Sequence, residues 1–256
     1  MRIISSSTVF SRAVFLFADL FLAGCSTLPD PTETDDARLI RNEFLSEIES
    51  KAKVVRLSDN AQFSMQPLPT GIWAGRFEVS REVWIAVTGN DPSNYPSHEP
   101  NLPVVNVSFY DCLSFVKKLN SMPGAIASGL SFRLPTVKEW RYACRGGGEG
   151  NYGLRVDGTS AGMDRLGWYN GNSRTMYPLR SGQLDPNAYG LYDMHGNAEE
   201  WAVFLDGSGD YPRLCGGSIY SSARNCGIGS IYGERKSYRS RDVGFRLFAD
   251  SRSNVK

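Results

Sequence analysis

Several kinds of residue are scarce in this chain, and each scarcity argues against a class of function. The formal charge is only +1, from 28 basic and 27 acidic residues, and no run of lysines and arginines occurs, which argues against a nucleic-acid partner. Only two histidines, His98 and His195, are present, and they are too distant in sequence to indicate an iron site. We expect His195 to be a partly exposed loop residue. No Cys-x-x-Cys pair occurs, which argues against zinc.

A long hydrophobic run is also missing. The apolar stretch 13–23 is short and is interrupted by Asp19, so it is a weak candidate for a membrane span. It ends in Leu22-Ala-Gly-Cys25, which resembles a bacterial lipoprotein signal, in which small residues precede a cysteine that becomes lipidated. We therefore predict a signal peptide over 1–24 and lipidation at Cys25, with an ordinary cleaved signal and an incidental cysteine as the alternative.

The lipidation site sets the expected location and domain order. Ser26 follows the lipidated cysteine and, by the usual sorting pattern of such lipoproteins, favours the outer membrane of a bacterial cell envelope. Several acyl chains on one cysteine would anchor the protein strongly. Residues 25–37 are polar and contain prolines, so we expect a flexible tether. Residues 38–69 are assigned to an N-terminal helix and a lead-in strand, and residues 70–250 to one globular domain.

Four further cysteines, Cys112, Cys144, Cys215 and Cys226, remain for the globular part. In an oxidising compartment they can form disulfides, and four cysteines allow three pairings that the sequence does not distinguish. The alternative is that some of them are small buried side chains.

Helix signals are clear at several places. The first helix is expected over 36–53, with Lys51 and Lys53 near its end, where cations suit the helix dipole. Three more helices are expected to begin at Ser80, Ser108 and Thr136, of which the last opens a Thr-x-x-Glu capping box. The residues expected on their buried faces are Trp84, then Phe109, Leu113, Val116 and Leu119, then Trp140 and Ala143.

The rest of the chain indicates short strands and long connections. Strands are expected at 54–57 and 72–79, and residues 121–131 are expected to form a loop of small residues. Glycine is abundant, with 26 residues, and aromatic residues make up 12%, which indicates a loop-rich domain held by aromatic side chains. Residues 146–188 are expected to be long connections over a small sheet.

The stretch Tyr189-Gly-Leu-Tyr-Asp-Met-His-Gly-Asn-Ala-Glu-Glu-Trp201 has the most distinctive composition. Its aromatic and leucine residues can anchor in a core, and its oxygen-bearing side chains between them can bind a hard cation. On composition alone, a solvated acidic turn is the simpler interpretation.

This stretch resembles the signature of the formylglycine-generating enzyme, or sulfatase-modifying factor, superfamily. Other segments match that family in the same order over roughly residues 70 to 250. They are Gly75–Ser80, Pro103–Asp111, Phe132–Trp140 with Tyr142–Gly146, Gly216–Ser218 and Gly244–Arg246. The resemblance implies an α+β, C-type-lectin-like fold: a small twisted antiparallel sheet with a few helices and much irregular chain.

The resemblance also implies a calcium site. Asp193 and Glu200 would supply carboxylate oxygens, and Gly196 and Ala198 would supply backbone carbonyls. Glu199 stands where the family usually has a bulky aromatic residue. A second calcium site of active members needs an asparagine near 167–169, where Trp168 or Tyr169 stands instead, so it is not carried over.

Active members of the family bind copper(I) through two cysteines spaced Cys-x-x-x-x-Cys just after Gly-Gly-Ser. Here Ser218 matches the family serine, Ser221 stands at the first cysteine position, and Cys226 alone could serve as the second. A hydroxyl does not replace a thiolate as a copper(I) ligand, which makes copper improbable. If the chain is active, Ser218 and Cys226 are the catalytic candidates. A Ser218–His195–Asp193 hydrolase has no support from spacing.

Residues 219–242 are rich in tyrosine, serine, arginine and glycine, a mixture typical of recognition loops. They also resemble the variable region of retroelement-diversified lectin-fold proteins, although Ile219 stands where those relatives usually have tryptophan. The alternative is a polar surface without a ligand. The candidate binding residues are Tyr220, Ser221, Ser222, Arg224, Tyr232, Tyr238 and Arg239.

Two functions follow from these observations. The favoured one is a lipid-anchored extracytoplasmic protein that binds an unknown ligand or partner protein through residues 219–242, held at the membrane by Cys25. The alternative is a copper-dependent oxidoreductase of the formylglycine-generating type that acts on protein cysteines.

Overall fold

The computed structural model describes residues 35–96, 99–148, 150–152, 160–205 and 210–252. The predicted signal peptide, the lipidation site and most of the tether lie outside these residues, as does His98. Within the described residues, no helix has the length and apolar character needed to cross a membrane.

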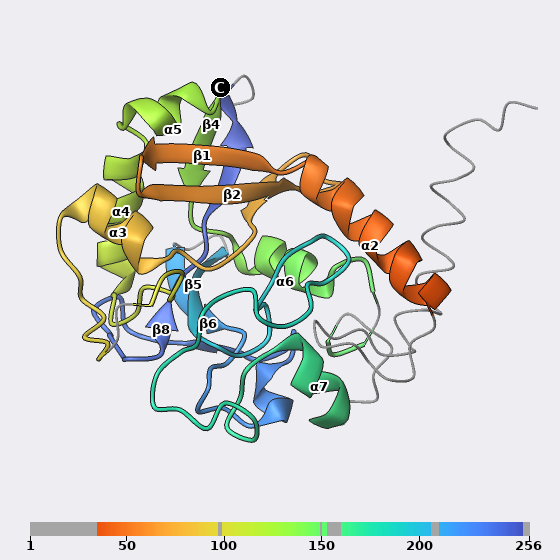
Figure 1. Cartoon of the computed structure of the whole chain (residues 1–256). Coiled ribbons are helices and arrows are strands. Elements are labelled where there is room, and N and C mark those ends of the chain that lie inside the picture. Colours follow the sequence, from red (N-terminus) through yellow and green to blue (C-terminus); the bar gives the residue numbers. More distant parts are fainter. Residues whose placement is uncertain (1–34, 97–98, 149, 153–159, 206–209, 253–256) are drawn as a thin grey trace, which may run out of the picture.

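Two sheets organise the domain (Figure 1). The larger one is antiparallel, and its strands lie in the order β1 (Lys53–Ser58), β2 (Ala61–Pro67), β3 (Trp73–Gly75), β9 (Phe248–Ser251) and β4 (Leu130–Arg133). The smaller one has the order β7 (Ile231–Gly233), β6 (Asp210–Cys215), β5 (Glu199–Leu205) and β8 (Val243–Gly244), and its β5–β8 pair is parallel. The α+β prediction is confirmed, with two sheets in place of one.

The lead-in segment is part of the larger sheet. The strand expected at 54–57 is β1, whereas the strand expected at 72–79 is only the three residues of β3, and β2 was not predicted. β1 pairs with β2, and β2 pairs with β3. The expected boundary at residue 70 therefore falls inside one continuous sheet.

Helix α2 (Asp35–Ser50) extends to one side of the larger sheet and leads into the start of β1 (Figure 1). The helix ends before Lys51, and Lys53 begins β1 and donates to the carbonyl of Ser128. The expectation that these two lysines lie near the end of the helix is therefore wrong. The C-terminal end of the helix contacts the domain: Gln66 donates to the carbonyl of Ile48 at 3.3 Å.

The predicted caps are confirmed. Ser80, Ser108 and Thr136 are the N-caps of α3 (Arg81–Thr88), α4 (Phe109–Leu119) and α6 (Val137–Arg145), and the last two form complete capping boxes. Helix α6 ends at Gly146 in the left-handed conformation, as the sequence indicated. These local signals were readable because each cap needs only residues three or four apart.

The buried face of α4 differs from the prediction. Leu113 is exposed, whereas Cys112 and Phe115 are buried beside Phe109 and Leu119. The sequence contains two possible apolar stripes on this helix, and the one that meets Trp84 is chosen by tertiary packing: Phe115 stacks on Trp84 with ring centroids 5.0 Å apart.

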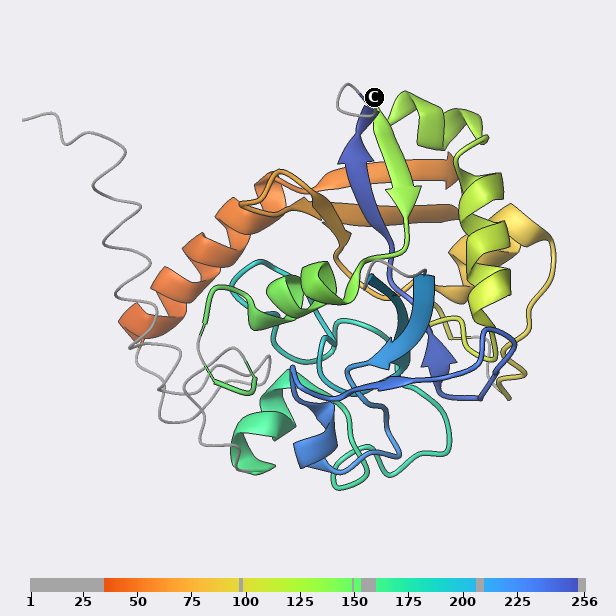
Figure 2. The same cartoon turned by 180° about the vertical axis from the view of Figure 1, so that it is seen from behind.

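Three short elements were missed or only partly expected. Helix α5 (Pro123–Ala127) and β4 occupy most of the expected loop 121–131, and α7 (Ser160–Leu166) interrupts the long connection 146–188. Residues 167–188, which follow α7, are irregular and lie mostly in the lower half of the molecule (Figures 1 and 2).

The stretch 189–201 runs into β5 and is buried over most of its length. The expectation of a solvated acidic turn is wrong, because Asp193, Glu199 and Glu200 are each less than a tenth exposed. Gly196 shows how tightly this segment is packed: it has φ +81°, and a Cβ there would lie 2.1 Å from the carbonyl oxygen of Trp168.

Candidate functional site

One arginine and three carboxyl groups form a buried charge cluster around Glu200 of β5. Arg246 donates to both oxygens of Glu200, with the closest contact at 2.7 Å, and to the backbone carbonyls of Gly75 and Tyr192. Trp140 donates its indole N–H to the same carboxylate at 2.7 Å. The arrangement holds Glu200 in place without exposing it.

For the other two acids of the cluster, burial raises the pKa more than the attraction of Arg246 lowers it. Burial and the neighbouring carboxylates raise the pKa of Glu78, although Arg246 opposes the shift. Burial also raises the pKa of Asp193, to about 6. Asp193 accepts from the backbone N–H of Gly182 with one oxygen, while its other oxygen is buried and has no hydrogen-bond partner.

The calcium prediction does not fit this arrangement of side chains. Asp193 offers a free buried oxygen, but both oxygens of Glu200 already accept from Arg246 or Trp140. A divalent cation bound to Glu200 would also lie beside the guanidinium, where like charges repel. No group of three or more His, Cys, Asp or Glu side chains able to hold a metal occurs in the described part of the chain. The predicted calcium site contains only two such side chains, with two backbone carbonyls, so the absence of a larger group does not decide it. Calcium binding therefore stays a prediction.

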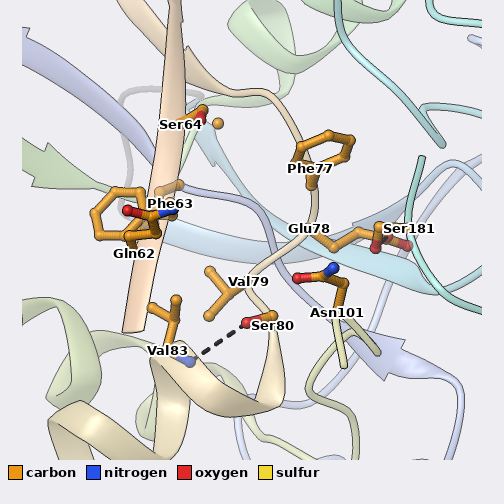
Figure 3. Close-up of a pocket in the computed structure, with 12 residues that line it drawn as sticks. Gln62, Phe63, Ser64, Phe77, Glu78, Val79, Ser80, Val83, Asn101 and Ser181 are labelled. Carbon is orange, nitrogen blue, oxygen red and sulfur yellow. Dashed lines mark hydrogen bonds between the residues drawn. The ribbon is translucent and has the colours of Figure 1, made fainter. Parts of the chain in front are cut away.

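A small cavity of about 120 Å³ opens beside this cluster (Figure 3). Phe63, Val79 and Val83 lie on one side of it, and Glu78 lies on the other with Ser181. The carboxylate of Glu78 already accepts from the Ser181 hydroxyl at 2.6 Å and from the side-chain amide of an asparagine at 3.0 Å. The acid that lines the cavity therefore has a structural role.

His195 is buried, and the expectation of a partly exposed loop histidine is wrong. Its Nδ1 lies 2.8 Å from the carbonyl oxygen of Cys226, and the thiol of Cys144 lies 3.7 Å from its Nε2. Burial lowers the pKa of His195 to about 4, so the imidazole is neutral at ordinary pH. Ser218 and Asp193 have other partners, in agreement with the absence of a hydrolase triad.

All four cysteines of the globular part are buried and free, so the disulfide alternative is not realised. Burial raises the pKa of each thiol, that of Cys226 to about 12. A protonated, enclosed thiol is a poor nucleophile and a poor metal ligand.

The two positions that the family resemblance assigns to copper do come together. Gly217 has φ +70°, and a Cβ built on it would lie 3.0 Å from the Cys226 sulfur and 3.1 Å from the Ser221 hydroxyl oxygen. The Ser221 hydroxyl accepts from the backbone N–H of Ser218 at 3.1 Å. The fold therefore places both residues beside the same glycine, but only one of the two carries sulfur.

Ser218 has a structural part in this loop. Its hydroxyl donates to Asp242 at 2.7 Å and accepts from the backbone N–H of Tyr220 at 3.3 Å. These contacts tie the start of the segment 219–242 to its end. Ser218 is itself buried, so it does not face a substrate.

The candidate binding residues divide into two groups. Tyr220, Ser222, Arg224, Tyr232 and Arg239 are exposed, which suits contact with a partner. Tyr220 lies under the guanidinium of Arg241, 4.8 Å from the ring centroid, a contact that sequence reasoning missed.

Two of the predicted contact residues face inward. Ser221 is engaged by the backbone, and Tyr238 is half-buried against the larger core cluster. Of the exposed group, Arg239 is held by Asp111 at 2.6 Å, and the Tyr232 hydroxyl donates to Glu199. Burial raises the pKa of Glu199 to about 7.

The structure adds residues from the long connections to this surface. The Tyr220 hydroxyl donates to the carbonyl of Met176, whose side chain is 61% exposed. The next residue, Tyr177, meets Tyr95 edge to face at 5.7 Å. Sequence reasoning missed these residues because they come from segments that carry no periodic pattern, and only the aromatic character of Tyr95 and Tyr177 offered a signal.

The sulfatase-modifying factor enzyme 1-like domain family matches residues 47–251 of this chain. The chain belongs to this family. The family match begins well before residue 70, in agreement with the position of β1 and β2 in the larger sheet.

Two relatives and two structures place the chain within the family. Chaperone protein LppX of Paenibacillus barcinonensis is 26% identical over 228 residues, covering 70% of this chain and 75% of that protein. The formylglycine-generating enzyme of Thermomonospora curvata is 30% identical over 139 residues, covering 47% of this chain and 41% of the enzyme. The chain thus spans less than half of that enzyme.

Among solved structures, Treponema denticola variable protein 1 is similar with a TM-score of 0.65 and 25% identity, covering 77% of this chain and 98% of that one. PvdO from Pseudomonas aeruginosa has a TM-score of 0.59 and 17% identity, covering 78% and 91%, which shows a shared fold alone. The C-type-lectin-like, sulfatase-modifying-factor fold is thereby confirmed.

Proposed function

We propose that this family member is a lipid-anchored extracytoplasmic binding protein, and that it recognises a partner protein through the surface of residues 219–242. The observation that carries the proposal is the pair of positions around Gly217, where the Ser221 hydroxyl and the Cys226 thiol both lie close to the same glycine. Copper(I) needs soft ligands, and a protonated thiol beside a hydroxyl supplies too little of that character for the oxidase chemistry of active members.

The surface chemistry supports recognition. Tyr220 and Tyr232 are 39% and 44% exposed, and Arg241 covers the ring of Tyr220. Tyrosine offers a large, stiff contact area at low entropic cost, and arginine adds directed hydrogen bonds, which is why both are frequent where proteins bind. Met176 extends this surface with a flexible apolar side chain.

The relatives point in the same direction. One is called a chaperone, and the similar Treponema denticola structure is called a variable protein. Formylglycine-generating enzymes also match, but over less than half of this chain. If this surface is diversified by a retroelement, the DNA near the gene should contain a second, nearly identical copy of the part that encodes residues 216–246.

The anchor is the part of the proposal that rests on sequence alone. The Leu22-Ala-Gly-Cys25 pattern indicates lipidation at Cys25, and Ser26 favours the outer membrane. Replacing Cys25 with serine should release the protein from the membrane fraction, whereas continued membrane association of that variant would contradict the anchor.

A chaperone-type probe tests the binding role. The probe is reduced, carboxymethylated α-lactalbumin, an unfolded acidic polypeptide, titrated against the purified globular domain. The wild type should bind it, and a Tyr220→Ala, Arg241→Gln variant should bind about tenfold or more weakly, since both replaced side chains are exposed and pack on each other. Ile126→Ala, at an exposed apolar residue on α5, is the control.

Two outcomes would contradict the proposal. One is equal binding by the wild type and the Tyr220→Ala, Arg241→Gln variant. The other is oxidation of a cysteine peptide to an aldehyde by the copper-treated wild type, which would establish the oxidoreductase alternative.

A further inference from the structure

The two sheets have four edge strands, β1, β4, β7 and β8, and other segments cover three of them. At β1, Gly124 of α5 lies so close that a Cβ there would be 1.9 Å from the carbonyl oxygen of Arg56. At β8, the outward backbone groups are paired: the N–H of Val243 donates to the carbonyl of Ser240 at 3.1 Å, and the carbonyl of Phe245, just after the strand, accepts from the N–H of Val79 at 2.9 Å. Covering an edge prevents unwanted pairing with other chains.

The β4 edge is covered by side chains. The amide of Asn120 donates to the carbonyl oxygen of Phe132 at 2.8 Å and accepts from its backbone N–H at 2.9 Å, as a neighbouring strand would. Arg252 donates to the carbonyl of Leu130 at 3.0 Å. The backbone groups that β4 directs outward are therefore already paired.

The fourth edge, β7, is open. Its residues pair with β6 in the register Leu214↔Tyr232, and a hydrogen bond from Gly216 to the carbonyl of Ser230 continues the same register. Bonded and non-bonded pairs alternate in an antiparallel ladder, so the backbone groups of Ile231 and Gly233 point away from β6. Among the described residues, no backbone hydrogen bond from another segment reaches these groups.

The surroundings of β7 are basic. Residues 219–242 contain five arginines and lysines and two acids, a formal charge of +3, whereas the whole chain carries +1. Both acids are engaged: Glu234 pairs with Arg235 at 3.8 Å, and Asp242 accepts from the hydroxyl of Ser218. Glu199, beneath the strand, accepts from Tyr232.

This charge selects the kind of partner. A second copy of the chain would bring two segments of charge +3 together at one edge, which disfavours self-pairing. An acidic segment would be attracted, and its backbone could fill the open hydrogen-bonding positions while its carboxylates approach Arg235 and Lys236.

We propose that β7 binds an extended acidic segment of a partner polypeptide as an added strand of the smaller sheet. The inference rests on the proposed recognition function and specifies how the partner binds. Main-chain pairing supplies affinity for many sequences, and the basic flank with Tyr232 supplies the preference for acidic ones.

Gly233 allows a sharp test. Gly233→Pro removes one outward N–H, at an edge position where proline is tolerated. Gly233→Ala keeps the N–H, and its Cβ would meet only the flexible end of Arg213, at 3.1 Å, so it is the matched control. The probe is a peptide of about ten alternating Asp and Val residues, long enough to span one strand.

The wild type and Gly233→Ala should bind this peptide equally, and Gly233→Pro about tenfold more weakly, the change expected for one backbone hydrogen bond. A peptide of the same sequence with N-methyl groups at alternate residues should lose binding, because its edge cannot pair. A version with Lys in place of Asp should bind more weakly, and added salt should reduce the difference. Equal binding of the Asp and Lys peptides would overturn the charge preference.

Including the Tyr220→Ala, Arg241→Gln variant separates this inference from the proposed function. If that variant loses binding while Gly233→Pro and the N-methylated peptide bind normally, recognition stands and strand addition is wrong. If neither set of changes affects binding, both are wrong. A dimer of the wild type that Gly233→Pro abolishes would assign the edge to self-association and overturn the proposal.

Discussion

Arg246 is fully buried beside three carboxyl groups, and it compensates charge that the core could not otherwise contain. It contacts Glu200 directly and lowers the pKa of both Glu78 and Asp193 relative to burial alone. The side chain also joins elements distant in sequence, because it donates to the carbonyls of Gly75 and Tyr192. The buried carboxyl groups of the core therefore depend on the single guanidinium of Arg246 for charge compensation.

Replacing Arg246 with methionine should therefore destabilise the domain by about 3–5 kcal/mol, because Glu200 loses its buried partner. Arg133→Met is the matched control, since Arg133 also binds two carboxylates but is about a third exposed, and we expect a loss of about 1 kcal/mol. Urea unfolding midpoints measure both. Similar losses for the two variants would show that burial does not matter here.

Glu199 makes stability depend on pH. Burial raises its pKa in the folded state to about 7, so the folded chain binds this proton more tightly than the unfolded chain does. The stability that this proton contributes is present below the ordinary carboxyl range and is lost as pH rises towards about 7. His195 has the opposite sign, because its lowered pKa removes stability as pH falls from about 6.5 towards about 4.

Comparison of the wild type with Glu199→Gln isolates the first effect. The stability of the wild type relative to the variant should fall between about pH 4.5 and about pH 7 in urea titrations, by about 1.4 kcal/mol for each unit of the pKa difference at most. Glu47→Gln, at an exposed glutamate of α2, is the control and should give a flat difference. A flat difference for Glu199→Gln as well would contradict the burial argument.

Calcium is testable on the same residues. Because Glu200 is engaged by Arg246 and Trp140, we expect the melting temperature to be the same in excess calcium and in EDTA. A ligand present at about a hundred times its Kd would stabilise the fold by about 2.7 kcal/mol, which a melting curve detects easily. A calcium-dependent shift that Asp193→Asn abolishes would show that Glu200 rearranges around a bound ion.

At the scale of elements, the capped helices hold the rest of the fold in position. The capping box of Thr136 and Glu139 begins α6, and α6 carries Trp140 to its hydrogen bond with Glu200. Glu139 is also paired with Arg133, which connects this helix to β4. The N-terminus of α6 therefore fixes one wall of the charge cluster.

Thr136→Ala should cost about 1 kcal/mol, because the N–H of Glu139 loses its acceptor. Ser114→Ala, at an exposed position in α4, should be close to neutral. Chemical denaturation compares them. If Thr136→Ala were also neutral, the capping box would be incidental to the stability of α6.

Elements that depend on local signals were predictable, and those that depend on distant partners were not. The caps at Ser80, Ser108 and Thr136 follow from residues within one turn. In contrast, β2 and α5 carry weak local signals and exist because β1 and β4 lie beside them. The exposure of Leu113 likewise depends on where Trp84 packs.

The site shows the same division. The motif residues were identified from the sequence, but their burial was not, because composition cannot tell whether Asp193 and Glu200 face solvent or Arg246. The contacts of Tyr220 with Arg241 and Met176 join segments that follow no pattern and are brought together only by the folded chain.

For the whole molecule, the family fold is kept while the chemistry at one position differs. The scaffold brings residues 221 and 226 to the same glycine, so the proposed absence of a copper site would need no change of fold. Function in such a fold depends on the particular site that it carries. Here the exposed tyrosines and arginines, together with the open β7 edge, are what the scaffold presents to a partner.

Copper(I) titration of the globular domain against a competing chelator tests this account most directly, with Ser221→Cys measured beside the wild type. The wild type should take up no stoichiometric copper(I), whereas Ser221→Cys should bind one equivalent, because its new sulfur would face that of Cys226 across Gly217. One equivalent bound by the wild type, and lost on Cys226→Ser, would contradict the central claim that this chain lacks a copper site.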